Sequence, residues 1–314
     1  WVALYESKSG ERGIFNRESA QQKAAQNKRR VWDVDFGTNP CSEILLRPNQ
    51  FCNLTEVVCR AEDDRTSLAR KVRVATLLGT IQSTLTNFGY LRKRWVTNTE
   101  EERLLGVSLT GIMDCNLLHS SPKKLSYSVP VPYLEDTLSY LRNVAVTTNK
   151  KWAEKLGIPQ STAITCVKPS GTVSQLVDSA SGIHARHSEY YIRTVRGDNK
   201  DPMTMFLKSI GIPNEPQVDG NIESKDVSVF SFPIHSNRQS IFRNDMSAIE
   251  QLQIWKVYAE HWCEHKPSVT ISVKEDEWLP VGAWCWENFD HLSGVSFLPY
   301  FDHSFLQAPY QEIT

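Results

Sequence analysis

The chain has 314 residues, of which 40% are hydrophobic and 23% are charged, a balance that is typical of a globular protein. Its 35 basic and 36 acidic side chains give a formal net charge of −1. This near-neutrality argues against a protein that coats nucleic acid or binds a membrane surface. No apolar run approaches the roughly 18–20 residues that span a bilayer, and no signal-peptide pattern opens the chain. We therefore expect a cytoplasmic protein.

The cysteine content indicates a reducing compartment. The chain has seven cysteines, an odd number that is too sparse for a disulfide-stabilised scaffold. In a reducing compartment such cysteines are mostly small core residues, and a minority are catalytic or redox-active. Because the chain begins at Trp1 rather than at a methionine, we interpret it as part of a longer protein.

Two helices are predicted in the first third of the chain. Residues 18–30 are polar and rich in helix formers, and they end in a basic cluster, residues 28–30, that we expect at a solvated helix C-terminus. From Asp63 to Arg94, apolar residues recur at spacings of three and four, which indicates an amphipathic helix. Acidic residues at its start and basic residues at its end match the helix dipole.

Short buried strands and helices follow along the chain. A further helix is predicted over Ser247–His261. The predicted strands are Arg103–Ile112, which turns at a glycine, Thr162–Val167, Ser268–Val273 and Val295–Leu298. This pattern implies the α/β class, with a parallel or mixed sheet and helices outside it. We favour an α/β barrel, and the periodicity alone is also compatible with an open sheet.

The most informative segment is Asn39–Ile44, with the sequence NPCSEI. Pro40 biases the residue before it away from helix, so we expect an extended or looped chain. In an extended chain, Asn39, Cys41 and Glu43 would project to one side within about 14 Å. A neighbouring carboxylate raises the pKa of a thiol and makes it a poor thiolate nucleophile. This chemistry suits hydrogen-atom transfer at sulfur, with the carboxylate as general base and the amide orienting a substrate.

The motif Asn-Pro-Cys-x-Glu-Ile resembles the finger loop of ribonucleotide reductases. Cys52 follows Cys41 by eleven residues, which is the spacing of the adenosylcobalamin-dependent type of this family. The resemblance implies a ten-stranded α/β barrel with this loop at its centre, of which the chain would hold the later part. It implies that Cys41 becomes the thiyl radical that removes the substrate's 3′ hydrogen, that Glu43 takes the 3′-hydroxyl proton, and that Asn39 hydrogen-bonds the substrate. Cys52 would be one of the two thiols that reduce the 2′ carbon.

A second motif, residues 168–174 with the sequence KPSGTVS, follows a predicted strand. Glycine, small hydroxyl residues and a helix start can form an anion site, although such residues also simply cap helices. The motif lacks the Gly-Lys-Ser/Thr ending of a Walker loop. Together with residues 181–184, it resembles the reductase loop that holds the substrate's phosphates. The resemblance assigns phosphate contacts to Ser170, Gly171, Thr172, Val173 and Ser174.

Three other clusters receive structural interpretations. Residues 261–265 contain two histidines and a cysteine in a spacing that fits no common zinc signature, so we expect structural residues at a helix end and no metal site. The adjacent tyrosines 190–191 are expected to pack within a strand. The acidic residues 100–102 are expected at a solvated helix start.

The resemblance covers nearly the whole chain. Some parts that the family has are nevertheless not found in these residues. The family's other redox cysteine precedes the finger loop, and a further cysteine pair lies on a C-terminal tail; residues 1–40 and 286–314 contain no cysteine. We therefore expect residues 1–314 to form part of one barrel domain, with the effector-binding region and the cysteine tail outside it. The expected partners are a ribonucleoside di- or triphosphate, a nucleotide effector, and thioredoxin or a similar dithiol, with the protein a monomer or homodimer.

Two features bear on the radical source. The Cys41–Cys52 spacing and the absence of adjacent tyrosines in residues 296–300 favour adenosylcobalamin over a dimetal site and tyrosyl radical from a separate subunit. Three alternatives stay open: a metallo-cofactor-dependent reductase large subunit, a catalytically inactive reductase-like domain that only binds, and another cysteine enzyme such as an acyl transferase.

Overall fold

The structure is a computed structural model that describes residues 1–7, 9–10, 13–300 and 306–313. The chain divides into two compact units. The first comprises residues 1–185, 239–241 and 245–300, and the second comprises 186–238, 242–244 and the described part of 301–314. Both the NPCSEI and the KPSGTVS motifs lie in the first unit. The assignment of all 314 residues to one barrel domain stays a prediction.

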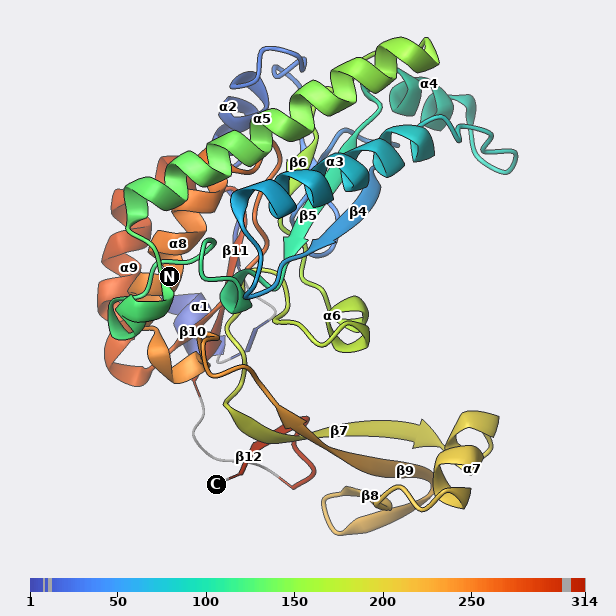
Figure 1. Cartoon of the computed structure of the whole chain (residues 1–314), viewed down its shortest axis with the longest axis vertical. Coiled ribbons are helices and arrows are strands. Elements are labelled where there is room, and N and C mark those ends of the chain that lie inside the picture. Colours follow the sequence, from blue (N-terminus) through green and yellow to red (C-terminus); the bar gives the residue numbers. More distant parts are fainter. Residues whose placement is uncertain (8, 11–12, 301–305, 314) are drawn as a thin grey trace. The chain divides into compact units, whose positions relative to one another are not determined.

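Helices and strands alternate along much of the chain (Figure 1). The α-helices are α1 (Val2–Ser7), α2 (Arg17–Ala25), α3 (Arg65–Gln82), α4 (Lys93–Glu102), α5 (Val131–Leu156), α6 (Thr172–Leu176), α7 (Pro202–Ser209), α8 (Ala248–His261) and α9 (Trp278–Glu287). The strands are β1 (Gly13–Ile14), β2 (Gly37–Thr38), β3 (Leu45–Leu46), β4 (Asn53–Val58), β5 (Leu105–Thr110), β6 (Thr165–Cys166), β7 (Tyr190–Asp198), β8 (Asn214–Asp219), β9 (Ile222–His235), β10 (Thr270–Val273), β11 (Val295–Pro299) and β12 (Tyr310–Glu312). Within the described ranges, no helix combines the length and the apolar character needed to cross a bilayer.

The first unit is built on parallel strands with helices between them. β4 pairs in parallel with β5, and β5 with β6. β10 and β11 form a second parallel pair, to which β1 adds in antiparallel orientation. A parallel bridge between Val167 and Pro267 joins the end of β6 to the segment that leads into β10. α3 packs on β4 and β5, and α5 packs on α3 (Figure 1). The α/β class is confirmed.

The predicted strands are confirmed, and two predicted helices are too long: the one expected over residues 18–30 ends at Ala25. β5, β6, β10 and β11 lie within the four predicted segments, apart from Pro299, which extends β11 by one residue. The helix expected over Asp63–Arg94 ends at Gln82, and the basic residues expected at its end lie around the start of α4. After Gln82, the hydroxyls of Ser83 and Thr84 donate to carbonyls of the last helical turn. Such side chains favour helix ends over helix interiors, which explains the early stop.

Aromatic residues of α8 attach this helix to the strands that carry the site. Trp255, Tyr258 and Trp262 are fully buried. The indole Nε1–H of Trp255 donates to the carbonyl of Pro267 at 2.9 Å, and that of Trp262 donates to the carbonyl of Cys166 at 2.7 Å. A buried indole stabilises the fold through its apolar area while its single N–H finds an acceptor. These bonds hold the end of β6 and the segment before β10 against α8 and Trp262, the residue that follows it.

The second unit is an antiparallel sheet with the strand order β12-β7-β9-β8. β7 and β9 pair from Tyr190 opposite His235 to Asp198 opposite Val227. The ring of Tyr190 stacks on that of His235, with centroids 4.6 Å apart, and Tyr191 is buried. The prediction that these tyrosines pack within a strand is confirmed, whereas the rest of this sheet was not predicted.

Candidate active site

The segment 39–44, which we call the finger loop, connects the two strands of a small hairpin. β2 and β3 pair in antiparallel orientation, with Thr38 opposite Leu45. The loop is a turn and not an extended strand. The N–H of Ser42 donates to the carbonyl of Asn39 at 2.9 Å, and the N–H of Ile44 donates to the side-chain oxygen of Asn39 at 3.0 Å. Asn39 closes the loop with its own side chain, as asparagine commonly does in turns.

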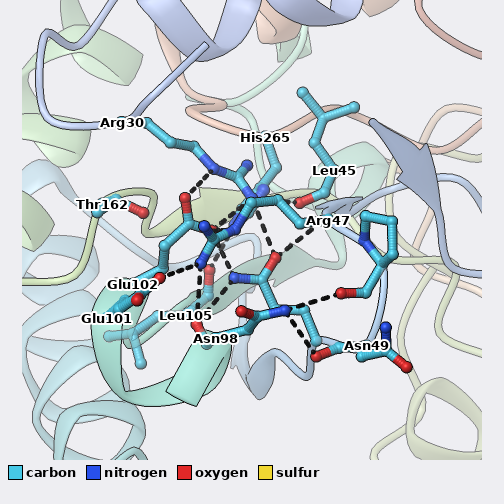
Figure 2. A network of polar contacts seen from close by, with 12 residues as sticks. Arg30, Leu45, Arg47, Asn49, Asn98, Glu101, Glu102, Leu105, Thr162 and His265 are labelled. Carbon is cyan, nitrogen blue, oxygen red and sulfur yellow. Dashed lines mark hydrogen bonds and ion pairs between the residues drawn. The ribbon is translucent and has the colours of Figure 1, made fainter. Parts of the chain in front are cut away.

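Buried charges hold the base of this hairpin (Figure 2). The Arg30 guanidinium binds both carboxylate oxygens of Glu102, at 3.1 and 2.9 Å, and donates to the carbonyl of Leu45 at 2.9 Å. Arg30 and Glu102 are only 5% and 4% exposed. Beside them, Arg47 pairs with Glu101 at 2.9 Å. The two-pronged geometry is the strongest form of carboxylate recognition by arginine.

This network corrects two predictions from the sequence. The basic residues 28–30 do not end a solvated helix, because α2 stops at Ala25 and Arg29 pairs with Glu264 at 2.6 Å. The acidic residues 100–102 close α4 rather than start a solvated helix, and Glu102 is buried. Helical periodicity gave no sign of these partners because they come from distant parts of the chain.

A small residue on β5 lets the finger loop enter the sheet. A Cβ built on Gly106 would lie 2.4 Å from Leu54 Cδ2, 3.0 Å from Ile44 Cδ1 and 3.3 Å from Cys166 Sγ. Only glycine leaves room for the Ile44 side chain between these neighbours. Ile44 is 1% exposed, so the finger loop is anchored by apolar burial at one end.

The thiol of Cys41 and the carboxylate of Glu43 have contrasting surroundings. Cys41 is exposed, whereas Glu43 is 1% exposed and no described residue hydrogen-bonds its Oε2. Desolvation and the negative charge of Glu43 raise the pKa of the Cys41 thiol, and the positive charge of Lys168 opposes this effect. The expected influence of the carboxylate on the thiol is confirmed, although desolvation is the larger cause.

The finger loop and the phosphate motif meet at a cavity of about 550 Å³. Cys41 lies on its wall together with its neighbours Pro40 and Ser42, and Pro169 reaches it from the second motif. The remaining wall comes from Gly10, Gly13, Ile14, Phe15, His184, Ser268, Val269, Thr270, Gly294, Val295 and Ser296. Residues 170–174, although described, do not line this cavity. The structure therefore brings the two motifs together at one cavity. Cys41 and its two neighbours are the part of the finger loop that lines it.

The residues assigned to phosphate binding, 170–174, fall into two sets. Ser170 and Ser174 are buried and bond each other, because the N–H of Ser174 donates to the Ser170 hydroxyl at 3.1 Å. The N–H of Ser170 donates to the Ser181 hydroxyl at 3.0 Å. The three residues between them, 171–173, are exposed where α6 begins. The first N–H groups of a helix have no acceptor within it, so these three are the better placed for a ligand.

Cys52 lies immediately before β4 and is half-buried. Burial raises the pKa of its thiol, and the charges of Arg30 and Glu43 act on it in opposite directions. Cys166 on β6 is fully buried, and burial likewise raises its thiol pKa, with smaller effects from Cys263, Cys52 and Glu43. All seven cysteines of the chain are free.

Two site residues had no role predicted from the sequence. His184 lines the cavity, and its Nε2 accepts the N–H of Thr270 at 3.1 Å while its Nδ1 lies 3.1 Å from the carbonyl of Ser181. Because Nε2 accepts this N–H, the proton of the ring lies on Nδ1, and burial lowers the pKa of the histidine. Lys266 lies beside the finger loop, between α8 and β10, and was missed because nothing in the local sequence marks it as buried.

The two histidines of residues 261–265 have separate partners. The Nδ1 of His261 lies 3.0 Å from the Ser139 hydroxyl, and the Nε2 of His265 lies 2.9 Å from the carbonyl of Leu105. Across the described ranges, no three His, Cys, Asp or Glu side chains are grouped so that they could hold a metal ion.

No family model matches the chain, but individual proteins do. It is 28% identical to an adenosylcobalamin-dependent ribonucleoside-triphosphate reductase of Lactobacillus acidophilus in an alignment of 301 positions that covers 90% of this chain and 39% of that protein. Enzymes of the same name from Lacticaseibacillus paracasei and Lactobacillus gasseri are 26% and 28% identical over 99% and 98% of this chain. The chain spans 44% and 43% of these two proteins, which is less than half of their length.

Two solved structures of ribonucleotide reductases resemble this chain in fold. A B12-dependent class II ribonucleotide reductase superposes on 99% of this chain and 46% of its own, with a TM-score of 0.80 and 23% identity. The α subunit of an Actinobacillus ureae class Id ribonucleotide reductase superposes on 96% of this chain and 60% of its own, with a TM-score of 0.59 and 14% identity. The expected reductase fold is confirmed. In sequence and in fold, the chain is a homologue of the adenosylcobalamin-dependent ribonucleotide reductases.

Proposed function

We propose that the protein to which this chain belongs reduces ribonucleoside triphosphates to 2′-deoxyribonucleotides for DNA synthesis, with adenosylcobalamin as its cofactor. The observation that carries the proposal is the exposed Cys41 thiol on a cavity wall that Pro169 of the phosphate motif shares. The names of the sequence relatives support the triphosphate substrate and the cofactor.

Cys41 would relay a hydrogen atom. A relay must keep its hydrogen until it leaves as an atom, and a raised thiol pKa keeps the S–H bond intact at neutral pH. Bound adenosylcobalamin would supply the radical chemistry that removes this hydrogen from Cys41, whose side of the finger loop lies on the cavity wall. The Cys41 thiyl then takes the 3′ hydrogen atom of the substrate and returns it after the 2′ carbon has been reduced.

Glu43 would act as the general base for the 3′-hydroxyl. Its Oε2 has no hydrogen-bond partner among the described residues, so a lone pair is available for the substrate's proton. The side-chain oxygen of Asn39 is occupied by the N–H of Ile44, which leaves the Asn39 amide N–H₂ as the group that would bind the substrate.

Cys52 would supply one of the two thiols that reduce the 2′ carbon. By the resemblance to the reductases, the second thiol would come from a cysteine that precedes the finger loop in the complete protein. Oxidation of the pair to a disulfide gives two electrons, the 2′-hydroxyl leaves as water, and thioredoxin or a similar dithiol then reduces the disulfide. The raised thiol pKa of Cys52 keeps it protonated until it is used.

The phosphate contacts would come mainly from Gly171, Thr172 and Val173, which are exposed at the start of α6. Ser170 and Ser174 would support these residues through their mutual hydrogen bond. We further propose that a nucleotide effector binds a part of the protein outside this chain, and that the protein acts in the cytoplasm as a monomer or homodimer.

The proposal is tested by incubating the complete protein with each ribonucleoside triphosphate, adenosylcobalamin and a dithiol, and by measuring deoxynucleotide formation. We expect product with at least one substrate, and none when the cofactor or the dithiol is omitted. Nucleotide binding without product from any of the four substrates would overturn the proposal and support a domain that only binds.

A further inference from the structure

Lys266 lies between the two loops of the site, and the chemistry proposed above does not use it. Its backbone N–H donates to the carbonyl of Glu43 at 3.1 Å. Its own carbonyl accepts the N–H of Val167 at 3.1 Å, one residue before the phosphate motif. The main chain of Lys266 therefore fixes the finger loop on one side and the end of β6 on the other.

The side chain of Lys266 is directed into the interior beside the finger loop. The residue is 1% exposed, and no described residue hydrogen-bonds its Nζ. A Cβ built on Gly294 would lie 2.2 Å from this Nζ and 3.2 Å from Ser42 Cβ. The ammonium thus occupies space that only a glycine at position 294 leaves open. The Phe15 ring, with its centroid 5.1 Å from Nζ, provides a weak cation–π contact.

The opposite charge nearby belongs to Glu43, which is equally buried. Its Oε2 has no hydrogen-bond partner, and neither side chain forms an ion pair within 4.0 Å among the described residues. The two charges nevertheless attract each other, because little water screens them in the interior. The pair is therefore electrostatically complementary without direct contact.

Such an arrangement costs stability. Burial without a partner penalises an ammonium group heavily, and desolvation lowers the pKa of Lys266 to about 7. Two titratable groups oppose this shift: Glu43 on the finger loop and Cys263 at the end of α8. An unbranched apolar side chain would fill the same space without the penalty. A destabilising charge at this place suggests a functional reason.

We propose that Lys266 is a positioning residue for the reaction, which compensates the Glu43 carboxylate electrostatically while leaving its lone pairs free for the substrate's proton. A direct ion pair would occupy those lone pairs, and an uncompensated buried carboxylate would bind a proton before the substrate arrives. The proton passes from the substrate's 3′-hydroxyl oxygen to a carboxylate oxygen of Glu43. This inference rests on the function proposed above.

The test compares Lys266→Met with a matched Lys256→Met variant, whose lysine lies on α8 and bonds Asn288, in the complete protein. For Lys266→Met we expect kcat to fall about 10- to 100-fold, which is a smaller loss than removal of the Glu43 base would cause. KM should change little. The acid limb of the pH–kcat profile should move to higher pH. Lys256→Met should leave both unchanged.

A second readout does not depend on turnover. An unfolded lysine keeps its proton up to about pH 10.5, whereas folded Lys266 releases its proton near pH 7. The unfolded state therefore binds more protons between these values, and the free energy of unfolding rises with pH. The Lys266→Met protein should therefore be more stable than wild type at pH 7. Its free energy of unfolding should also lack the rise with pH that the lysine causes.

Chemical rescue separates charge from packing. Lys266→Ala should regain turnover when ethylammonium is added, and Glu43→Gln should not. A Lys266→Met protein with wild-type kcat and an unmoved acid limb would overturn the role of Lys266 while the reductase proposal stands. A wild-type protein that makes no deoxynucleotide would overturn the reductase proposal, and this role with it.

Discussion

The Arg30 guanidinium and the Glu102 carboxylate lie 2.9 Å apart in the protein interior, and the same guanidinium donates to the carbonyl of Leu45 on the finger-loop hairpin. The ion pair therefore connects the end of α4 to the hairpin that carries Cys41 (Figure 2). Its first role is structural, since it fixes β3, the strand in which the finger loop ends.

Removal of one partner should be strongly destabilising. Glu102→Gln leaves the Arg30 charge buried without compensation, so we expect a loss of about 3–5 kcal/mol in the free energy of unfolding. Arg30→Met combined with Glu102→Met should lose much less than the two single changes together. Urea unfolding measures each value. The exposed Arg17–Asp35 pair is the control, and its coupling should be negligible. If the stability losses of the two single variants simply added up in the double variant, the interpretation would be contradicted.

Cys41→Ser should abolish nucleotide reduction in the complete protein. Serine has nearly the same size, but its O–H bond is too strong for oxygen to relay a hydrogen atom. Because Cys41 is exposed, the substitution should leave folding and nucleotide binding nearly intact. Cys285→Ala, at a buried cysteine outside the cavity lining, should retain turnover. Turnover of Cys41→Ser above a few percent of wild type would exclude Cys41 as the relay.

Glu43→Gln keeps the shape of the side chain and removes its basicity. A general base contributes on the order of 10²–10⁴ to a rate, so the chemical step should slow by that factor. Nucleotide affinity, measured by equilibrium binding, should stay within a small factor of wild type. An unchanged single-turnover rate would show that another group accepts the proton.

Gly171→Val should weaken nucleotide binding without harming the fold. No protein atom lies within 4 Å of a Cβ built at this position, so folding alone does not require the glycine. A bulky side chain there would block the approach of a phosphate to the start of α6. Gly89→Val, also with open space around the new Cβ, is the control. Ser170→Ala should cost only a modest factor. If Gly171→Val left nucleotide affinity unchanged, the motif would be only a helix cap.

The strands that the local sequence predicted are present, but many others, including most of the antiparallel sheet of the second unit, were not predicted, and helix ends were predicted poorly. β5 is buried along its whole length, as expected of a strand within a parallel sheet, and its apolar run was visible in the sequence. The end of α3 depended on Ser83 and Thr84, whose hydroxyls bond carbonyls of the helix itself. An apolar periodicity that continues past Gln82 does not reveal such competition.

The candidate site was predicted from motifs, and its supporting contacts were not. Cys41 and Glu43 were identified by residue type and spacing, and their catalytic roles stay predictions. The turn at Asn39, the Arg30–Glu102 pair and the position of Lys266 depend on hydrogen bonds or packing that local alternation does not report. Charged residues near helix ends were therefore expected in solvent, although Arg30 and Glu102 are buried.

The cofactor gives the last prediction. Asn39, Cys41 and Glu43 resemble residues of reductases with different radical sources, so the choice depends on the Cys41–Cys52 spacing, on Tyr300 lacking an adjacent tyrosine, and on the relatives' names. We expect anaerobic addition of adenosylcobalamin to the complete protein, with a nucleotide effector and a dithiol, to produce cob(II)alamin. Absorption and electron spin resonance detect this species, and turnover should need no second subunit. In the matched Cys41→Ser protein, any residual cobalt–carbon cleavage should yield no deoxynucleotide. A protein that is inert with adenosylcobalamin but turns over with a dimetal partner subunit would disprove the cofactor and leave the reductase proposal intact.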